Sequence, residues 1–335
     1  MNRRSSQQGL TLIELLISMA IGLLLAAAAS YLFVSTNRIS KTLEGKAQQQ
    51  ETAAIVLDVI GRDLKNAGFY PADFPTSAAS SKFQGAYANV VAAAKPAFNQ
   101  GIFGCSGGLF DVKTGDCPAP VATEPDSLVV NYFSADNFSI DGVGTRKDCL
   151  GQNVEAADFG GFKYNAARAG SASASTDTVD LPLFISNVYG LGDEVTYQLD
   201  NKQSVTTRTF RCAGNGPNTE PYQPLVAGIS QLRFRYGAAE ATTLESPARF
   251  YTATEVSALA SADINGEMKT GWQRVSAVEV CVVTKTIDSS VRQTAAGSYT
   301  DCDGVKVDFT GADRAIYRQQ TRVFGVRNNL TKTYK

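Results

Sequence analysis

The chain has 335 residues and nearly balanced charge, with 31 basic against 32 acidic side chains. This balance and the lack of a long basic run argue against a nucleic-acid-binding protein. Because the sequence contains no histidine, catalysis by Ser-His-Asp or Cys-His groups and histidine-ligated metal sites are excluded. Ser-Lys, aspartate-pair and carboxylate-metal chemistry stay open on composition alone. Because no motif in the sequence supports them, we expect the chain not to be an enzyme and to carry no cofactor.

Residues 10–34 form an apolar segment near the N-terminus. A membrane-spanning helix needs about 20 mostly apolar residues, and this longer segment holds a single charged side chain, Glu14. A carboxylate inside a membrane is costly, so it is usually functional and requires a partner. Glu14 lies about one helical turn after Leu10. If the chain were cut between Gly9 and Leu10, the new amine would lie one turn from this carboxylate.

The residues around this point resemble a known processing signal. Residues 8–14, Gln-Gly-Leu-Thr-Leu-Ile-Glu, are similar to the class III signal of type IV pilins and type II secretion pseudopilins. The resemblance implies that prepilin peptidase removes residues 1–9 by cleaving after Gly9 and that the amine of Leu10 is methylated. It further implies that Glu14 pairs with an N-terminal amine when the subunit docks into a filament.

Two other interpretations of the N-terminus stay open. An ordinary secretory signal would use Arg3 and Arg4 as its basic region and residues 26–28 as its cleavage site. An acidic residue inside the apolar region and a helical pattern that continues past Ser30 argue against it. The segment could also be a plain single-pass anchor in which Glu14 has no role. The two arginines favour a cytoplasmic N-terminus, which would make residues 68–335 a periplasmic domain.

Residues 35–67 are expected to continue the helix as an amphipathic half. No proline occurs between residues 37 and 66, and Asn66-Ala67-Gly68 followed by Pro71 is typical of a helix end. Small apolar residues recur at helical spacings. They are Leu43, Ala47, Ala54, Leu57, Gly61 and Leu64. We expect this face to pack on the globular domain, whereas residues 10–34 face lipid or the core of a filament.

The rest of the chain is expected to be β-rich with long loops. Alternating or β-branched runs predict strands at residues 127–133, 194–199, 206–211, 231–236, 277–284 and 320–327. Within residues 231–236, the alternation predicts that Leu232, Phe234 and Tyr236 face inward and that Arg233 and Arg235 face outward. Residues 71–123 indicate an irregular linking region, and residues 166–178 a mobile surface loop. A long helix followed by antiparallel strands is an α+β layout.

Six cysteines follow the apolar segment, and an even number in a translocated domain suggests disulfide bonds. Fifteen pairings are possible, and we favour the sequential set, Cys105–Cys117, Cys149–Cys212 and Cys281–Cys302. No metal site is expected. The acidic residues Asp301, Asp303 and Asp308, and those of residues 263–267, do not have the spacing of a calcium-binding loop.

Several blocks of the sequence resemble the PilW family of minor pilins. These blocks are residues 62–70, 126–132, 147–151, 224–237, 272–278 and 321–328. The resemblance implies the pilin architecture, in which the second half of the helix lies against the sheet. It implies an inner-membrane stage, then a place near the tip of a type IV pilus, with minor and major pilins and a PilY-type adhesin as partners.

The family implies roles in pilus initiation, twitching motility, adhesion or DNA uptake. One alternative is a J-like minor pseudopilin of type II secretion, which has a similar layout but is usually shorter. Another, of a different class, is a secreted binding module or enzyme with an ordinary signal peptide.

Overall fold

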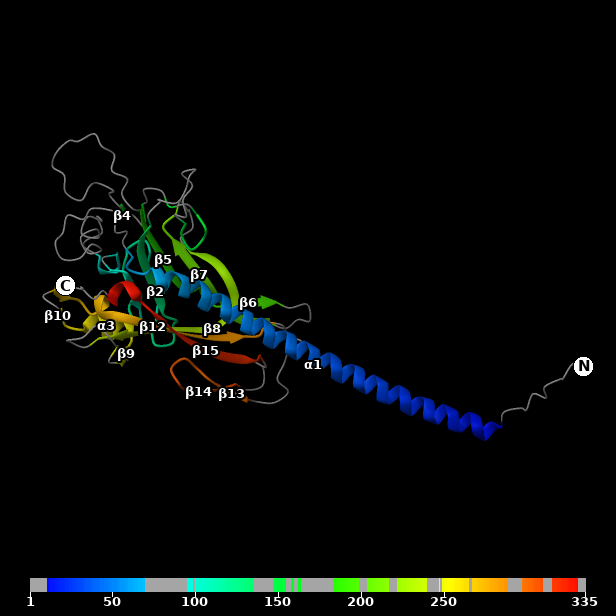
Figure 1. Ribbon diagram of the computed structural model, residues 1–335. Coiled ribbons are helices and arrows are strands. Elements are labelled where there is room, and N and C mark those ends of the chain that lie inside the picture. Colours follow the sequence, from blue (N-terminus) through cyan, green and yellow to red (C-terminus); the bar gives the residue numbers. More distant parts are fainter. Residues whose placement is uncertain are drawn as a thin grey trace, which may run out of the picture.

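One long helix and one large antiparallel sheet make up the fold (Figure 1). The expected α+β class is confirmed. The structure is a computed structural model that describes residues 11–69, 95–98, 100–134, 147–152, 154, 158–159, 162–163, 183–198, 204–216, 222–239, 247, 249–264, 267–287, 297–309 and 315–330.

Helix α1 runs without interruption from Leu12 to Asn66, which is about 80 Å at 1.5 Å per residue. It ends where Gly68 adopts a φ of 74°, a left-handed conformation that glycine tolerates best. The expected continuous helix with a glycine end is therefore confirmed. The second half of α1 lies along the globular domain, and the first half projects away from it (Figure 1).

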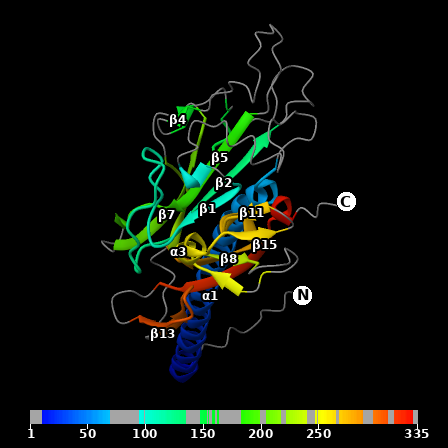
Figure 2. The same cartoon turned by 90° about the vertical axis from the view of Figure 1, so that its left-hand side faces the viewer.

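Nine strands form one antiparallel sheet. The main path has the order β1 (Ile102–Cys105), β2 (Ser127–Ser134), β5 (Leu183–Leu191), β7 (Ser204–Gly214), β8 (Gln223–Ala238), β12 (Val275–Lys285) and β15 (Tyr317–Gly325). Off this path, β6 (Val195–Gln198) pairs with β7, and β9 (Arg249–Tyr251) pairs with β8. The sheet twists, so β5 and β7 run obliquely to β15 (Figure 2).

The remaining described elements are short. Three two-stranded sheets pair β3 (Asp158–Phe159) with β4 (Phe162–Lys163), β10 (Ala262–Ile264) with β11 (Glu267–Lys269), and β13 (Gly297–Thr300) with β14 (Lys306–Phe309). The short helices are α3 (Ala253–Ala258) and the 3-10 helices η2 (Pro96–Phe98), η3 (Trp272–Arg274) and η4 (Arg327–Leu330).

All six expected strands are present, most of them longer than expected, and β5 was not expected. The linking region is irregular in its described part, apart from β1 and η2. Residues 70–94 and the expected loop at 166–178 lie outside the described residues.

The main core lies between α1 and one face of the sheet. Leu232, Phe234 and Tyr236 of β8 point into it, as the alternation predicts, and each has a valine of β12 as its neighbour across the pair. Ile60 and Leu64 of α1 are fully buried against this layer. Burial of this apolar surface fixes the second half of the helix on the domain.

The prediction of which α1 residues pack on the domain is wrong for the first part of the packed half. Leu43, Ala47 and Ala54 are exposed, whereas Gly45 and Gln49 are buried. From Ala53 onward the buried residues include the expected Leu57, Gly61 and Leu64. The physical reason is that α1 first meets the ends of β12 and β15, where backbone carbonyls favour an amide side chain over an aliphatic one.

Candidate assembly site on the N-terminal helix

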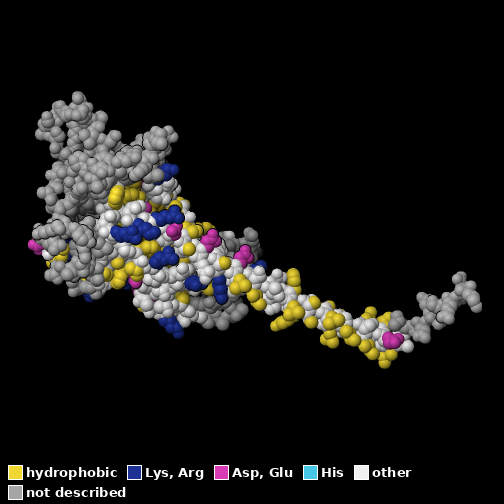
Figure 3. All heavy atoms as spheres, viewed as in Figure 1, with side chains coloured by type: hydrophobic (Ala, Val, Ile, Leu, Met, Phe, Trp, Pro, Cys, Tyr) yellow, Lys and Arg dark blue, Asp and Glu magenta, His cyan; other side chains and the backbone are white. Residues whose placement is uncertain are grey.

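The projecting half of α1 carries apolar side chains that the globular domain does not cover (Figure 3). Between Leu12 and Val34 the large apolar side chains are 48–78% exposed. Among the described residues, α1 is the one helix long and apolar enough to cross a membrane, and its apolar stretch is not buried within the protein. An apolar surface of this length needs lipid or other helices to cover it.

Glu14 and Thr11 form a capping box at the start of α1. The Glu14 carboxylate oxygen Oε2 accepts hydrogen bonds from the backbone N–H and from the hydroxyl of Thr11, both at 3.0 Å. In return, the Thr11 hydroxyl accepts the backbone N–H of Glu14 at 3.4 Å. The Thr-x-x-Glu spacing is a known signature of this motif, so this local partner of Glu14 could have been found from the sequence.

The capping box leaves the carboxylate of Glu14 only partly satisfied. Both hydrogen bonds reach Oε2, and among the described residues Oε1 accepts none. A carboxylate has room for several donors. Gly9 and Leu10, the expected processing residues, lie outside the described residues, so the structure does not place the predicted amine.

Two features of the packed half of α1, one near its start and one near its end, hold it against β12 and β15. The side-chain amide of Gln49 donates to the carbonyl of Thr284 at 3.4 Å and to the carbonyl of Ile316. Further along, Gly61 faces the ring of Phe324, and a Cβ at this position would overlap that ring. Glycine therefore permits the close approach of helix and strand at this point.

A buried polar cluster anchors the end of α1 to β2 and β5. The carboxylate of Asp63 accepts hydrogen bonds from the Tyr189 hydroxyl and the Asn187 side-chain amide, both at 2.6 Å, and from the Tyr132 hydroxyl at 3.4 Å. These donors compensate a carboxylate that would otherwise be costly to enclose. Sequence analysis missed Asp63, because its partners lie more than sixty residues away along the chain.

Burial raises the pKa of Asp63 above its ordinary value of 3.8, because a charged carboxylate loses its hydration there. The hydrogen bonds from Tyr189, Asn187 and Tyr132 oppose this shift, and the negative charge of Asp148 adds to it. The folded state therefore binds a proton at this site more tightly than the unfolded chain does.

The raised pKa of Asp63 makes a prediction for stability as a function of pH. Its contribution is fully present below about pH 4 and is lost as the pH rises through the folded-state pKa. We expect the wild-type chain to lose unfolding free energy relative to Asp63→Asn as the pH rises from about 4 through the raised folded-state pKa. Denaturant unfolding of both proteins across this range measures the difference. Asp58→Asn, a change at an exposed residue of the same helix, is the control, and a pH-independent difference for Asp63→Asn contradicts the prediction.

Three disulfide bonds join the cysteines as Cys105–Cys117, Cys149–Cys212 and Cys281–Cys302, the sequential pairs that we favoured. The second bond is coupled to the helix anchor. The backbone N–H of Cys149 donates to the side-chain carbonyl of Asn187 at 2.9 Å, and the amide of the same Asn187 donates to Asp63. The disulfide loop therefore helps to orient a partner of the helix.

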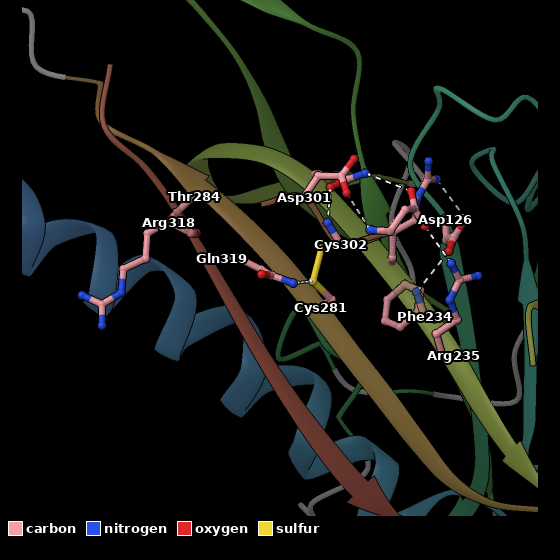
Figure 4. The surroundings of a disulfide bond; sticks show 12 residues. Asp126, Phe234, Arg235, Cys281, Thr284, Asp301, Cys302, Arg318 and Gln319 are labelled. Atoms are coloured by element: carbon pink, nitrogen blue, oxygen red, sulfur yellow. Dashed lines mark hydrogen bonds and ion pairs between the residues drawn. A yellow bond between two sulfur atoms is a disulfide. The ribbon is translucent and has the colours of Figure 1, made fainter. Parts of the chain in front are cut away.

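The third disulfide holds a turn over the outer face of the sheet (Figure 4). Asp303 in this turn forms ion pairs with Arg233 at 3.2 Å and with Arg235 at 2.7 Å. Arg233 also pairs with Asp126 at 3.2 Å and is only 7% exposed. Arg233 faces away from the core, as predicted, but its side chain is not exposed to solvent. Asp303 of the turn and residues 122–126 surround its guanidinium group.

The acidic residues of this turn are used within the protein. The carboxylate of Asp301 accepts the backbone N–H groups of Asp303 and Val305 at 2.9 and 2.8 Å. Nowhere in the described part of the chain do three or more acidic or cysteine side chains gather as a metal-binding group.

Comparisons with known proteins agree with this geometry. Residues 196–328 match the family model of the type IV pilus-assembly protein W, PilW, and residues 4–30 match the prokaryotic N-terminal methylation motif. A type IV-like pilin from Thermus thermophilus is similar over 84% of this chain and 98% of that chain, with 9% identity and a TM-score of 0.36, a likeness too low to carry weight. No curated protein matches the chain significantly.

A prepilin-type methylation motif on a long, exposed apolar helix that leads into an antiparallel sheet defines a type IV pilin-like protein. The match to the PilW family model, which spans β6 to β15, indicates which kind of pilin-like protein this is. The chain is type IV pilin-like, with a PilW domain over residues 196–328 and a prepilin-type methylation motif over residues 4–30. Pilins are structural proteins, and the apolar helix is consistent with membrane anchoring and incorporation into a pilus.

Proposed function

We propose that the chain is a minor pilin that helps to initiate a type IV pilus and becomes part of it. Residues 1–9 are a leader that prepilin peptidase removes after Gly9, and the exposed amine of Leu10 is then methylated. Residues 10–34 hold the subunit in the inner membrane with residues 68–335 in the periplasm. The observation that carries this proposal is the uncovered apolar half of α1 with Glu14 near its start.

In the filament, the apolar half of α1 leaves lipid and packs on the helices of other minor and major pilins. The apolar surface extends past Val34, because Ile39 and Leu43 lie one turn apart and are 58% and 61% exposed. Neighbouring helices would cover these residues as well as the membrane-spanning part. The Oε1 of Glu14, which accepts no hydrogen bond from the described residues, supports pairing with the N-terminal amine of Leu10 in the same or a neighbouring subunit.

The proposal has three further parts. The chain acts in initiation near the pilus tip, it has a PilY-type adhesin as a further partner, and it takes part in twitching motility, adhesion or DNA uptake. The match to the PilW family model favours this role over that of a type II secretion pseudopilin. We assign the chain no cofactor and no catalytic residue.

The mature N-terminus tests this proposal. Mass spectrometry of the chain purified from cell envelopes or from sheared filaments is expected to find Leu10 as the first residue, with a methylated amine. An intact Met1 would contradict processing, and a new terminus near Ser30 would indicate an ordinary secreted protein. Gly9→Ala in the full-length chain is the paired variant and is expected to retain the leader.

A further inference from the structure

Strand β15 is the last strand of the nine-stranded sheet, and within the described residues its outer edge is unpaired. It pairs with β12 in a continuous register, from Lys285 opposite Tyr317 to Ala277 opposite Gly325, and no described strand pairs with its other side. At the opposite end of the sheet, β1 has four residues and is mostly buried. By contrast, β15 has nine residues and none of them is buried. An open edge of this length is a template for another strand.

The hydrogen bonds of β15 show which backbone groups face the open edge. The carbonyl of Arg318 accepts the hydroxyl of Thr284 on β12 at 3.3 Å, so Arg318 directs its backbone groups toward β12. In a strand, backbone direction alternates from one residue to the next. The N–H and C=O groups of Gln319, Thr321 and Val323 therefore point away from the sheet.

The side chains of β15 alternate between the two faces of the sheet. Figure 4 shows Arg318 pointing toward α1, while Gln319 points toward the Cys281–Cys302 disulfide. The Gln319 amide lies 3.5 Å from the sulfur of Cys281. Thr321 and Val323 share the face of Gln319, and Val323 is 52% exposed. Both are good strand formers.

The edge lacks several of the features that usually prevent pairing, although it carries two arginines. β15 contains no proline, and its register with β12 has no bulge, although proline, bulges and very short strands are the common protections of an edge. Tyr299 of β13 stacks on Tyr317 with ring centroids 4.4 Å apart. This stacking contact lies at the first residue of the strand.

The charge of β15 selects the kind of strand that can join it. The strand carries Arg318 and Arg322, both exposed, and no acidic residue. A second copy that paired antiparallel about Gln320 would place Arg318 of one copy opposite Arg322 of the other. Like charges directly opposite are destabilising, whereas opposite charges stabilise a cross-strand pair. In this register the charge disfavours self-pairing, whereas an acidic strand from a different chain would complement both arginines.

We propose that the open edge of β15 receives an extended acidic segment of a co-assembling pilin, which adds as one further strand beside residues 319–323. The outward N–H and C=O groups of these residues bind its backbone, and the two arginines select its acidic side chains. The identity of the donor as a co-assembling pilin rests on the proposed function. The open edge and its charge do not.

Proline at an outward-facing position tests the edge. Pro lacks the N–H that the added strand needs, and edge strands accept it when that N–H faces solvent. In cells that express the full-length chain, we expect Thr321→Pro to lower the amount in sheared filaments about tenfold or more. Its membrane level and thermal unfolding should match the wild type. Thr321→Val, which keeps the N–H, is the matched control and is expected to assemble normally.

The arginines test the chemistry of the donor. We expect Arg322→Glu to reduce incorporation into filaments and Arg322→Lys to preserve it. Normal assembly of a folded Thr321→Pro chain would overturn the edge proposal. Normal assembly of Arg322→Glu would overturn the acidic donor.

Hydrogen exchange tests strand addition at β15 independently of the proposed function. It also tests strand addition if the Thr321→Pro chain does not fold. We compare the full-length wild-type chain in native membranes with the same chain in detergent. Strand addition is supported if hydrogen exchange at the amides of Gln319, Thr321 and Val323 is slower by about tenfold or more in membranes. The exchange rates of the inward-facing amides of β15 should change little. Outward amides that exchange equally fast in both overturn strand addition. Absence of the wild-type chain from filaments counts against the proposed function alone.

Discussion

Replacing Glu14 with glutamine is expected to keep the chain out of filaments while leaving it in the membrane. Glutamine also closes a capping box with Thr11, so the start of α1 should be preserved and the negative charge is the main loss. Without that charge, the N-terminal amine loses its partner inside an apolar filament core. Breaking a buried ion pair is strongly destabilising, so we expect the amount in filaments to fall by about 100-fold or more.

The measurement for Glu14→Gln is the ratio of chain in sheared filaments to chain in membranes, determined by immunoblot. Glu44→Gln is the matched control, because Glu44 is an exposed glutamate on the same helix but outside the apolar segment. We expect Glu44→Gln to assemble like the wild type and both variants to have Leu10 as the mature N-terminus. Equal ratios for Glu14→Gln and the wild type would remove the proposed role of the carboxylate.

Removal of the Cys149–Cys212 disulfide is expected to have the largest effect on stability of the three disulfide bonds. The two cysteines are 63 residues apart, and the loop-closure entropy of such a bond corresponds to about 4 kcal/mol of unfolding free energy. The substitution Cys149→Ala with Cys212→Ala would also loosen Asn187, because the N–H of Cys149 donates to it. Asn187 in turn donates to Asp63, so the end of α1 should become less protected as well.

Denaturant unfolding of the full-length chain in detergent, under non-reducing conditions, measures this loss. Trp272 is the single tryptophan of the chain and is buried in the core, so its fluorescence follows unfolding of the globular domain. The control removes Cys105 and Cys117, which close a loop of 12 residues and should contribute about 3 kcal/mol. A smaller loss for the 63-residue loop than for the 12-residue loop would contradict the prediction.

Much of the backbone layout follows from local sequence patterns. The absence of proline and the ending at Gly68 predict a single helix, because local backbone preferences act over a few residues. Alternation in β8 predicts the inward direction of Leu232, Phe234 and Tyr236 for the same reason. The hydrogen-bond partner of Glu14 could also have been predicted from the sequence, since Thr11 and Glu14 have the capping-box spacing.

The tertiary structure was needed wherever a residue depends on what it meets. Strand β5 escaped prediction because its polar residues Ser186 and Asn187 interrupt an apolar run, yet both are fully buried and their environment is supplied by other strands. Asp63 looks like one more charged residue of a helix until Tyr189 donates to it from β5.

The amino-acid sequence by itself determined the apolar helix, its single carboxylate, its end and the alternation of several strands. These features depend on neighbours within a few positions of the chain. Only the tertiary structure decided that Gln49 rather than Leu43 packs on the domain, that a disulfide-held turn and residues 122–126 surround Arg233, and that β15 lies at an open edge of the sheet. These outcomes depend on long-range strand order and on the packing of side chains far apart in the chain, which no local pattern specifies.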